Sequence, residues 1–332
     1  MLEGAPGRAG TAQMPGILSH ISFVLCLGVG VLIYHIPISA LGALVFKNET
    51  YSHIALIPVV SLFLLATRRH AILAVAERRP TLGCAVCVGG LLLYGVATGL
   101  WTQLRAAAFR PQDVPNDYLT LCMAGAVAWV IGSFIAVYGT AAFRQARFAL
   151  LFLLFAIPIP MFLLHRIVTS LQYASAHAAD LVFSLTGTPY HRAGMVFEFP
   201  NVAVEVAEVC SGIRSSLSLF ILSVLSGFLF LRTTSRRVLL ALAIVPITVV
   251  KNAFRIATVT LLANHVDMRF LTNHWIHQSG GIPFFAVALS MFIPLVWLLR
   301  KSEMRASRKQ QAADGKAKLR LRDSLPPPVA SG

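Results

Sequence analysis

Long apolar runs separated by short polar segments dominate this chain. The runs lie near residues 17–34, 54–67, 83–101, 118–138, 148–164, 212–231, 238–263 and 282–299. A helix needs about 17 to 25 apolar residues to cross the hydrocarbon layer of a membrane, and most of the runs reach that length. The pattern therefore predicts an all-α polytopic membrane protein with about eight transmembrane helices.

One segment, 186–207, departs from this pattern. It combines turn-forming residues, among them Gly187, Pro189 and Gly194, with alternating Val, Phe and Glu positions. Such alternation is typical of short strands. We expect a short β-like outer segment here, just before Cys210.

The apolar runs also predict the domain organisation. We expect an N-terminal cytoplasmic segment over 1–16, a single transmembrane domain over 17–300, and a basic, disordered cytoplasmic tail over 301–332. The first apolar run is long and continuous, so we interpret it as an uncleaved span and not as a signal peptide.

Composition supports a membrane protein, and the positions of the charges orient it. The 332 residues are 57% hydrophobic and carry a net charge of +15. Most Lys and Arg residues fall in alternate loops and in the C-terminal tail, which by the positive-inside rule places both termini in the cytoplasm. A basic tail of this kind suits anionic lipid headgroups, and nucleic acid is not an expected partner.

Cys210 is the cysteine whose position in the sequence suits a nucleophile. It lies at a water boundary, where the run 212–231 begins, and the start of a helix favours a thiolate. The remaining cysteines lie inside apolar runs, where small packing residues are the better interpretation; they are Cys26, Cys84, Cys87 and Cys122.

Arg255 is the most informative polar residue inside a predicted span. An ionisable group in hydrocarbon is costly and usually has a task. Asn252 and Lys251 lie three and four residues earlier, on nearly the same helical face. A structural role, in which Lys251 and Arg255 bind carbonyls or bridge helices, stays open.

Histidines follow this span, in the segment that enters the last one. His274 and His277 are three residues apart, so one turn can present both. A helix N-terminus favours neutral imidazole, the form that accepts a proton. A metal site is the weaker alternative because no carboxylate or cysteine completes the ligand set, and an interfacial histidine satisfied by water is the other.

Four motifs together resemble the exosortases and archaeosortases, and they cover roughly residues 50 to 300 in that family's order. The motifs are Cys210-Ser211-Gly212-Ile213-Arg214-Ser215, Asn252-Ala253-Phe254-Arg255-Ile256, His277 followed by Gly281, and Tyr51-Ser52-His53 followed by Pro58. The cysteine motif is the specific one. Two positions depart from the common family pattern, Ile54 after the Tyr51 motif and Gln278 after His277.

The resemblance implies a catalytic set in which Cys210 is the nucleophile, Arg255 stabilises the oxyanion and His277 is the general acid and base. Arg214, Asn252, His53 and Glu208 are expected to give secondary support. Neither a cofactor nor a metal is implied.

The resemblance also implies an activity. We expect an integral membrane cysteine protease or transpeptidase that cleaves C-terminal sorting signals of exported proteins, made of a short motif, a transmembrane helix and a basic tail. PEP-CTERM-like signals are the implied substrates. The orientation inferred from the charges brings Cys210, Arg255 and His277 to the outer, periplasmic face of the cytoplasmic membrane. The resemblance implies a bacterium that makes extracellular polysaccharide.

Two other classes of function compete with this one. A transporter or channel would use Lys251, Asn252 and Arg255 to line a polar pathway, but no paired broken helices are apparent. A membrane acyltransferase would carry a lipid chain on Cys210, but the His and Asp constellation that it usually needs is not visible.

Overall fold

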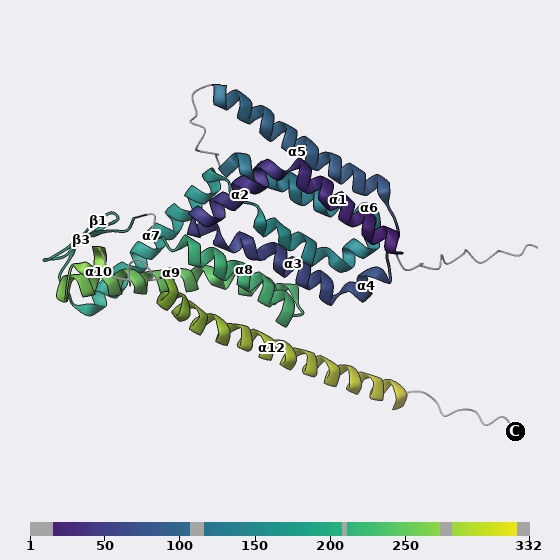
Figure 1. Cartoon of the computed structure of the whole chain (residues 1–332). Coiled ribbons are helices and arrows are strands. Elements are labelled where there is room, and N and C mark those ends of the chain that lie inside the picture. The colour runs from purple at the N-terminus through teal and green to yellow at the C-terminus, as the bar shows by residue number, and fades with distance from the viewer. Residues whose placement is uncertain (1–15, 107–115, 208–210, 273–280, 324–332) are drawn as a thin grey trace, which may run out of the picture. The chain divides into compact units, whose positions relative to one another are not determined.

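The computed structural model describes residues 16–106, 116–207, 211–272 and 281–323 (Figure 1). The chain divides into two compact units, Met1–His165 and Arg166–Gly332, and each is described by itself.

The described part of the first unit is helical. Its elements are α1 (Ile17–Ile33), α2 (His35–Lys47), the 3-10 helix η1 (Glu49–Ala55), α3 (Leu56–Thr67), α4 (Arg69–Leu73), α5 (Pro80–Ala106), α6 (Asn116–Phe152) and the 3-10 helix η2 (Leu153–Ala156). Helix α7 (Met161–Thr186) begins in this unit and continues into the second.

Helices α1 and α2 form a bent pair, which the sequence did not predict. Their axes differ by 75° across the intervening Tyr34. Tyr34 is fully buried, with its ring centroid 5.0 Å from that of Tyr94 in α5. The apolar run 17–34 is therefore the first arm of a broken pair that continues to Lys47.

Helix α6 doubles back at Gly139, the one non-helical residue within its bounds. A straight helix would place Thr120 and Pro158 about 55 Å apart at 1.5 Å per residue. Instead the Thr120 hydroxyl donates to the Pro158 carbonyl at 2.8 Å, and the Met161 N–H donates to the Asp117 carboxylate at 2.7 Å. The ends of the two arms therefore lie at the same level.

Glycine is required at this turn. Gly139 has φ +85°, and a Cβ there would come within 1.7 Å of the Glu77 carbonyl oxygen. The two arms correspond to the predicted spans 118–138 and 148–164, but the second arm begins earlier, since Arg144 and Arg147 are exposed positions within the helix. This arm also ends earlier, before the backbone break that contains Pro158 and Pro160.

Helices α5 and α6 pack along a seam of small residues. A Cβ on Gly90 would come within 2.6 Å of the Gly125 carbonyl oxygen, and one on Gly132 within 2.7 Å of Cys87 Sγ. Small residues let helix backbones approach closely within a membrane. The contact of Cys87 with this seam agrees with its interpretation as a packing residue.

The second unit contains the small sheet and the last long helices. Its elements after α7 are β1 (His191–Ala193), β2 (Val196–Glu198), β3 (Ala203–Glu205), α8 (Ile213–Phe230), α9 (Thr234–His265), α10 (Arg269–Thr272) and α12 (Gly281–Asp323). The strands form one antiparallel sheet in the order β1-β2-β3, which matches the β-like segment predicted over 186–207.

Apolar packing joins α8, α9 and α12 into one cluster, in which Leu219, Leu240 and Phe292 are buried. The carboxylate of Glu303 in α12 binds the backbone of the connection between α8 and α9. It accepts the backbone N–H groups of Arg232 at 2.9 Å and Thr233 at 2.7 Å, where α8 turns into α9. Helix α12 then continues to Asp323, whereas the sequence was expected to be disordered after residue 300.

Six helical segments in the described ranges are long and apolar enough to cross a membrane, or seven if α1 and α2 form one span. The predicted number of about eight is reached when the bent pair is counted and, in addition, both arms of Asn116–Ala156 are taken as spans. The prediction of an all-α polytopic membrane protein with a short β segment is confirmed. The six segments are Thr50–Thr67, Pro80–Gln103, Asn116–Ala156, Ile213–Phe230, Thr234–His265 and Pro283–Lys316.

Candidate active site

A polar face of α9 forms the centre of the candidate site. Lys251 and Asn252 are 3% and 0% exposed, and Arg255 is partly exposed one turn further along. Positions three and four residues apart share a helical face, as the sequence predicted. Phe254, which is 49% exposed, lies on another face. The polar side chains are thus directed inward within the second unit.

Gly212, two residues after Cys210 in the chain, lies against this face. It is the N-cap of α8 and has φ +72°, a left-handed conformation that favours glycine. A Cβ there would come within 2.9 Å of Asn252 Oδ1 and 3.1 Å of Lys251 Nζ. Both the backbone conformation and the close packing against α9 therefore select glycine at this position.

Serine side chains connect Lys251 to the start of α8. The Lys251 ammonium donates to Ser215 Oγ, and the Ser215 hydroxyl donates to the Gly212 carbonyl at 3.0 Å. Ser216 also donates to that carbonyl, from its backbone N–H at 3.0 Å and from its hydroxyl at 2.7 Å. These bonds fix the first turn of α8 against the polar face of α9.

The chain is also fixed on the other side of the undescribed segment 208–210. Val206 is 2% exposed, and its carbonyl accepts a 3.0 Å bond from the Gln172 side-chain amide in α7. Its N–H donates to the Met195 carbonyl at 3.0 Å. Ser211, immediately after the segment, is fully buried. Cys210 thus belongs to a short segment whose two flanks are both anchored.

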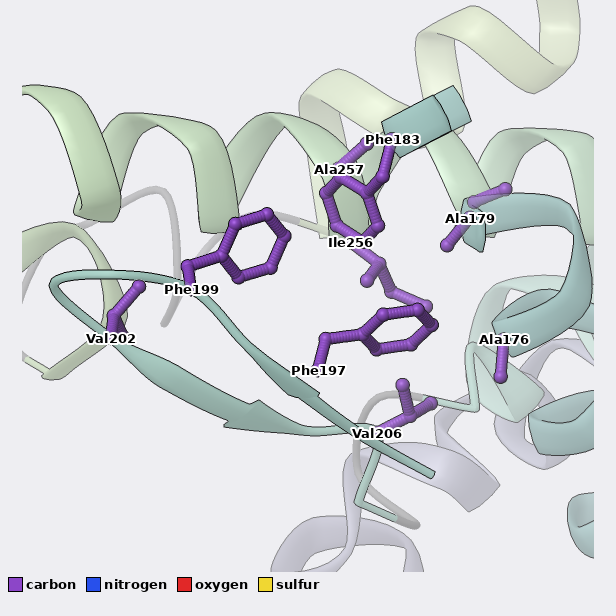
Figure 2. Packing of buried hydrophobic residues seen from close by; sticks show 10 residues of the cluster. Ala176, Ala179, Phe183, Phe197, Phe199, Val202, Val206, Ile256 and Ala257 are labelled. Carbon is purple, nitrogen blue, oxygen red and sulfur yellow. The ribbon is translucent and has the colours of Figure 1, made fainter. Parts of the chain in front are cut away.

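An aromatic and aliphatic cluster packs the small sheet against α7 and α9 (Figure 2). Phe183 of α7 packs against Phe197 of β2 and against Phe199, with ring centroids 5.1 and 4.9 Å apart. Ile256 of α9 joins this cluster. Because successive residues of a helix point about 100° apart, the core contact of Ile256 helps to direct the adjacent Arg255 away from the cluster.

Polar contacts fix the same sheet at two further points. Asn201, in the loop before β3, donates from its backbone N–H to Asn264 Oδ1 at 3.2 Å and from its side-chain amide to the Asn264 carbonyl at 3.0 Å, at the end of α9. The Asp180 carboxylate accepts from Tyr190 at 2.8 Å and from Arg192 at 2.9 Å. Burial alone would raise the pKa of Asp180, but these two hydrogen bonds together with the nearby charges of Arg192 and His177 outweigh it and lower the pKa below 3.8.

Several of the predicted site residues lie outside the described residues. They are the nucleophile Cys210, the general acid and base His277, and Glu208 and His274. Arg255 and Asn252 share the polar face as predicted. Arg214 is an exposed position in the first turn of α8.

His53 lies in η1, in the first unit, where its Nδ1 is 3.1 Å from the Thr50 carbonyl. The neighbouring Tyr51 is 3% exposed and accepts a hydrogen bond from Asn116 at the start of α6. Since the two units are described separately, the expected support of His53 for the catalytic set stays a prediction.

The structure adds residues that the sequence did not single out as site residues. Gly212 and Ser215 belong to the cysteine motif, but their contacts with Lys251 depend on the tertiary packing of α8 on α9. Gln172 stands out in the sequence as a polar residue in an uneven apolar stretch. Nothing in the sequence indicated that its side chain would donate a hydrogen bond to Val206.

Within the described ranges, no three or more His, Cys, Asp or Glu side chains are grouped so that they could hold a metal ion. His274 and His277 lie outside those ranges.

The fold and this site define a polytopic membrane protein whose candidate active site lies at the start of one apolar helix and along the polar face of the next. Residues 45–294 match the family model for the transmembrane exosortase. The chain therefore belongs to the exosortase family, and the resemblance seen in its motifs is confirmed. No curated protein and no solved structure showed a significant match.

Proposed function

We propose that this exosortase is a membrane cysteine peptidase or transpeptidase that cleaves the C-terminal sorting signals of exported, membrane-anchored proteins. Membership of the family supports this activity. The observation that carries the assignment is the contact of Lys251 and Asn252 with Gly212. It joins the helical face that holds Arg255 to a residue two positions after Cys210.

In the proposed first step, the Cys210 thiolate attacks the scissile carbonyl carbon of the substrate. The C–N bond breaks, His277 protonates the leaving amine, and a thioester of the upstream fragment remains on Cys210. The leaving fragment then carries the transmembrane helix and the basic tail. The start of α8 supports this step because a helix N-terminus favours the thiolate.

Arg255 stabilises the oxyanion that forms on the carbonyl. It lies about 6 Å further along α9 than Lys251, at 1.5 Å per residue. Removal of an oxyanion donor typically costs about 3 kcal/mol of transition-state stabilisation. A guanidinium is suited to this task because it stays charged and is more weakly hydrated than an ammonium.

The second step releases the thioester. Water or an amine attacks the carbonyl carbon, His277 accepts the proton of that nucleophile, and the Cys210 thiolate leaves. Attack by water gives hydrolysis, and attack by an amine on a lipid or glycan gives transfer. Arg214, Asn252, Glu208 and His53 are proposed as secondary support.

We place the reaction at the outer face of a bacterial inner membrane, with both termini in the cytoplasm. The concentration of Lys and Arg in alternate loops and in the tail supports this orientation. The substrates would carry PEP-CTERM-like signals. Contact of Lys251 and Asn252 with the Gly212 turn supports an enzyme over a channel, because these side chains are packed against the start of α8.

The test uses membranes that contain the full chain and a candidate substrate with a short motif, a transmembrane helix and a basic tail. Wild type is compared with Cys210→Ala, Arg255→Ala and His277→Ala, and Cys84→Ala and Arg147→Ala serve as matched controls. We expect processing to be lost in the first three and kept in the controls. Equal processing by all variants, at equal protein levels, would contradict the proposal.

A further inference from the structure

Helix α12 carries cations beside exposed aromatic rings, at the point where its apolar part ends. The guanidinium carbon of Arg300 lies 5.9 Å from the ring centroid of Phe230 at the end of α8, and the ammonium of Lys301 lies 4.4 Å from that of Trp297. Phe230 and Trp297 are 47% and 56% exposed. Exposed aromatic rings at the ends of apolar spans are typical of the boundary between membrane and water. These contacts therefore place Arg300 and Lys301 at the level of the lipid headgroups.

Glu303 fixes the direction in which the next turn of α12 faces. It is 6% exposed, its carboxylate binds the connection between α8 and α9, and it lies 3.4 Å from the guanidinium of Arg236. Lys301 and Arg305 are each two residues from Glu303, which corresponds to about 200° around the helix. The two cations therefore face away from the connection between α8 and α9.

The same face of α12 changes from apolar to basic along the helix. Trp297, Lys301 and Arg305 follow at intervals of four residues, so they lie in one row. The acidic residues of α12 whose side chains are described, Glu303 and Asp314, lie on the opposite side. A lipid with an anionic headgroup fits this row, because its acyl chains meet the apolar part and its phosphate meets the cations.

Distance from the membrane separates the near cations from the far ones. Arg305 lies about 7.5 Å beyond Arg300 along the helix, which is within about one Debye length at physiological salt. Lys309 and Lys316, also at exposed positions, lie about 13 and 24 Å beyond Arg300. Attraction to an anionic surface falls off within a Debye length. Lys301 and Arg305 therefore contribute more to headgroup binding than the two distant lysines.

We propose that the row Trp297, Lys301 and Arg305, with Arg300 beside it, is a binding site for an anionic phospholipid. The phosphate accepts charge-assisted hydrogen bonds from the cations, and the indole ring lies at the level of the glycerol and upper acyl chains. The row depends on the folded packing of α12 against α8 and α9, so bound lipid stabilises the folded protein. The site is separate from the proposed catalytic residues.

The test titrates dioleoylphosphatidylglycerol into the full-length protein in detergent and follows the unfolding temperature. Wild type is compared with the double variant Lys301→Gln, Arg305→Gln and with Lys309→Gln, Lys316→Gln, a matched control that removes the same charge from the same helix. We expect the lipid concentration at half of the maximal rise to increase on the order of tenfold in the first variant. In the control it should change by less than about twofold.

Two conditions test the chemistry of the ligand. Dioleoylphosphatidylcholine, which has no net charge, should raise the unfolding temperature of wild type less than the anionic lipid does. At about 1 M sodium chloride the Debye length falls to about 3 Å, and the two double variants should become alike. None of these measurements needs substrate processing, so their result is independent of the proposed function.

Equal midpoints for the two double variants at low salt overturn the proposal, and so does an equal rise with phosphatidylcholine in wild type. A rise of the same size with inorganic phosphate alone would identify a free anion as the ligand and also overturns it. If Lys301→Gln, Arg305→Gln does not accumulate, Arg305→Gln and Lys316→Gln are compared as single variants. A midpoint several-fold higher in Arg305→Gln then supports the site, and equal midpoints overturn it.

Discussion

Asn252 Oδ1 lies 2.9 Å from the position that a Cβ on Gly212 would occupy. This contact joins the motif that contains Cys210 to the motif that contains Arg255, on neighbouring helices. It also explains why the residue before α8 is glycine, since both the space and the left-handed backbone exclude a larger side chain.

Gly212→Ala should therefore destabilise the protein and impair processing. A left-handed alanine costs about 1 to 2 kcal/mol, and the contacts with Asn252 and Lys251 add to that cost. Gly194→Ala is the matched control, because Gly194 has φ +64° with nothing within 4 Å of its Cβ position. Thermal unfolding in detergent should show a larger loss for Gly212→Ala, and equal losses would contradict the close packing.

The seam between α5 and α6 offers a second paired test. Gly90 and Gly89 are neighbours in the same helix, but only a Cβ on Gly90 would meet a backbone atom, at 2.6 Å from the Gly125 carbonyl oxygen. Gly89→Ala should be neutral or stabilising by up to about 1 kcal/mol, because alanine favours helix. Gly90→Ala should lower the unfolding temperature. A lower unfolding temperature for Gly89→Ala than for Gly90→Ala would contradict the close packing of α5 on α6.

Gln172 should affect catalysis through the segment before Cys210. Gln172→Leu leaves the buried Val206 carbonyl without its side-chain donor, which costs about 1 to 3 kcal/mol. We expect lower stability and slower processing, with the KM for substrate less affected than kcat. Gln145→Leu, at an exposed position of α6, is the control. Wild-type kcat in a folded Gln172→Leu protein would argue against this anchor.

The contact of Asp180 with Arg192 predicts a pH dependence of stability. The pKa of Asp180 is lowered in the folded state, so its contribution is present above its ordinary value of 3.8 and is lost as the pH falls through the folded value. The effect should be below about 1 kcal/mol, since the ion pair is partly exposed. Asp180→Asn should lower the unfolding temperature at pH 7, and the difference from wild type should shrink below pH 3.8. A difference independent of pH would contradict this role.

Much of the fold could be predicted because helix length and hydropathy are properties of local sequence. The runs 83–101, 212–231 and 238–263 all fall on helices, and the β-like segment 186–207 contains the sheet. A turn between the spans 118–138 and 148–164 was predicted, but its position at Gly139 was not, because it depends on the Glu77 backbone that packs against this glycine. The bend at Tyr34 likewise depends on packing against α5.

The parts of the site that follow from helical periodicity or from a sequence motif could be predicted. Lys251, Asn252 and Arg255 share a face because they are three and four residues apart. The contact of this face with Gly212 could not be predicted, because it depends on how α8 packs on α9. The anchoring of Val206 by Gln172 joins segments 34 residues apart, for which the sequence has no local signal.

The most direct test of the account is detection of the thioester on Cys210. Wild-type protein is incubated with substrate, denatured in acid and analysed by mass spectrometry, with and without hydroxylamine. We predict an adduct of the upstream substrate fragment on the Cys210 peptide that hydroxylamine removes and that Cys210→Ala lacks. Processing by Cys210→Ala at the wild-type rate, without any adduct, would contradict the account.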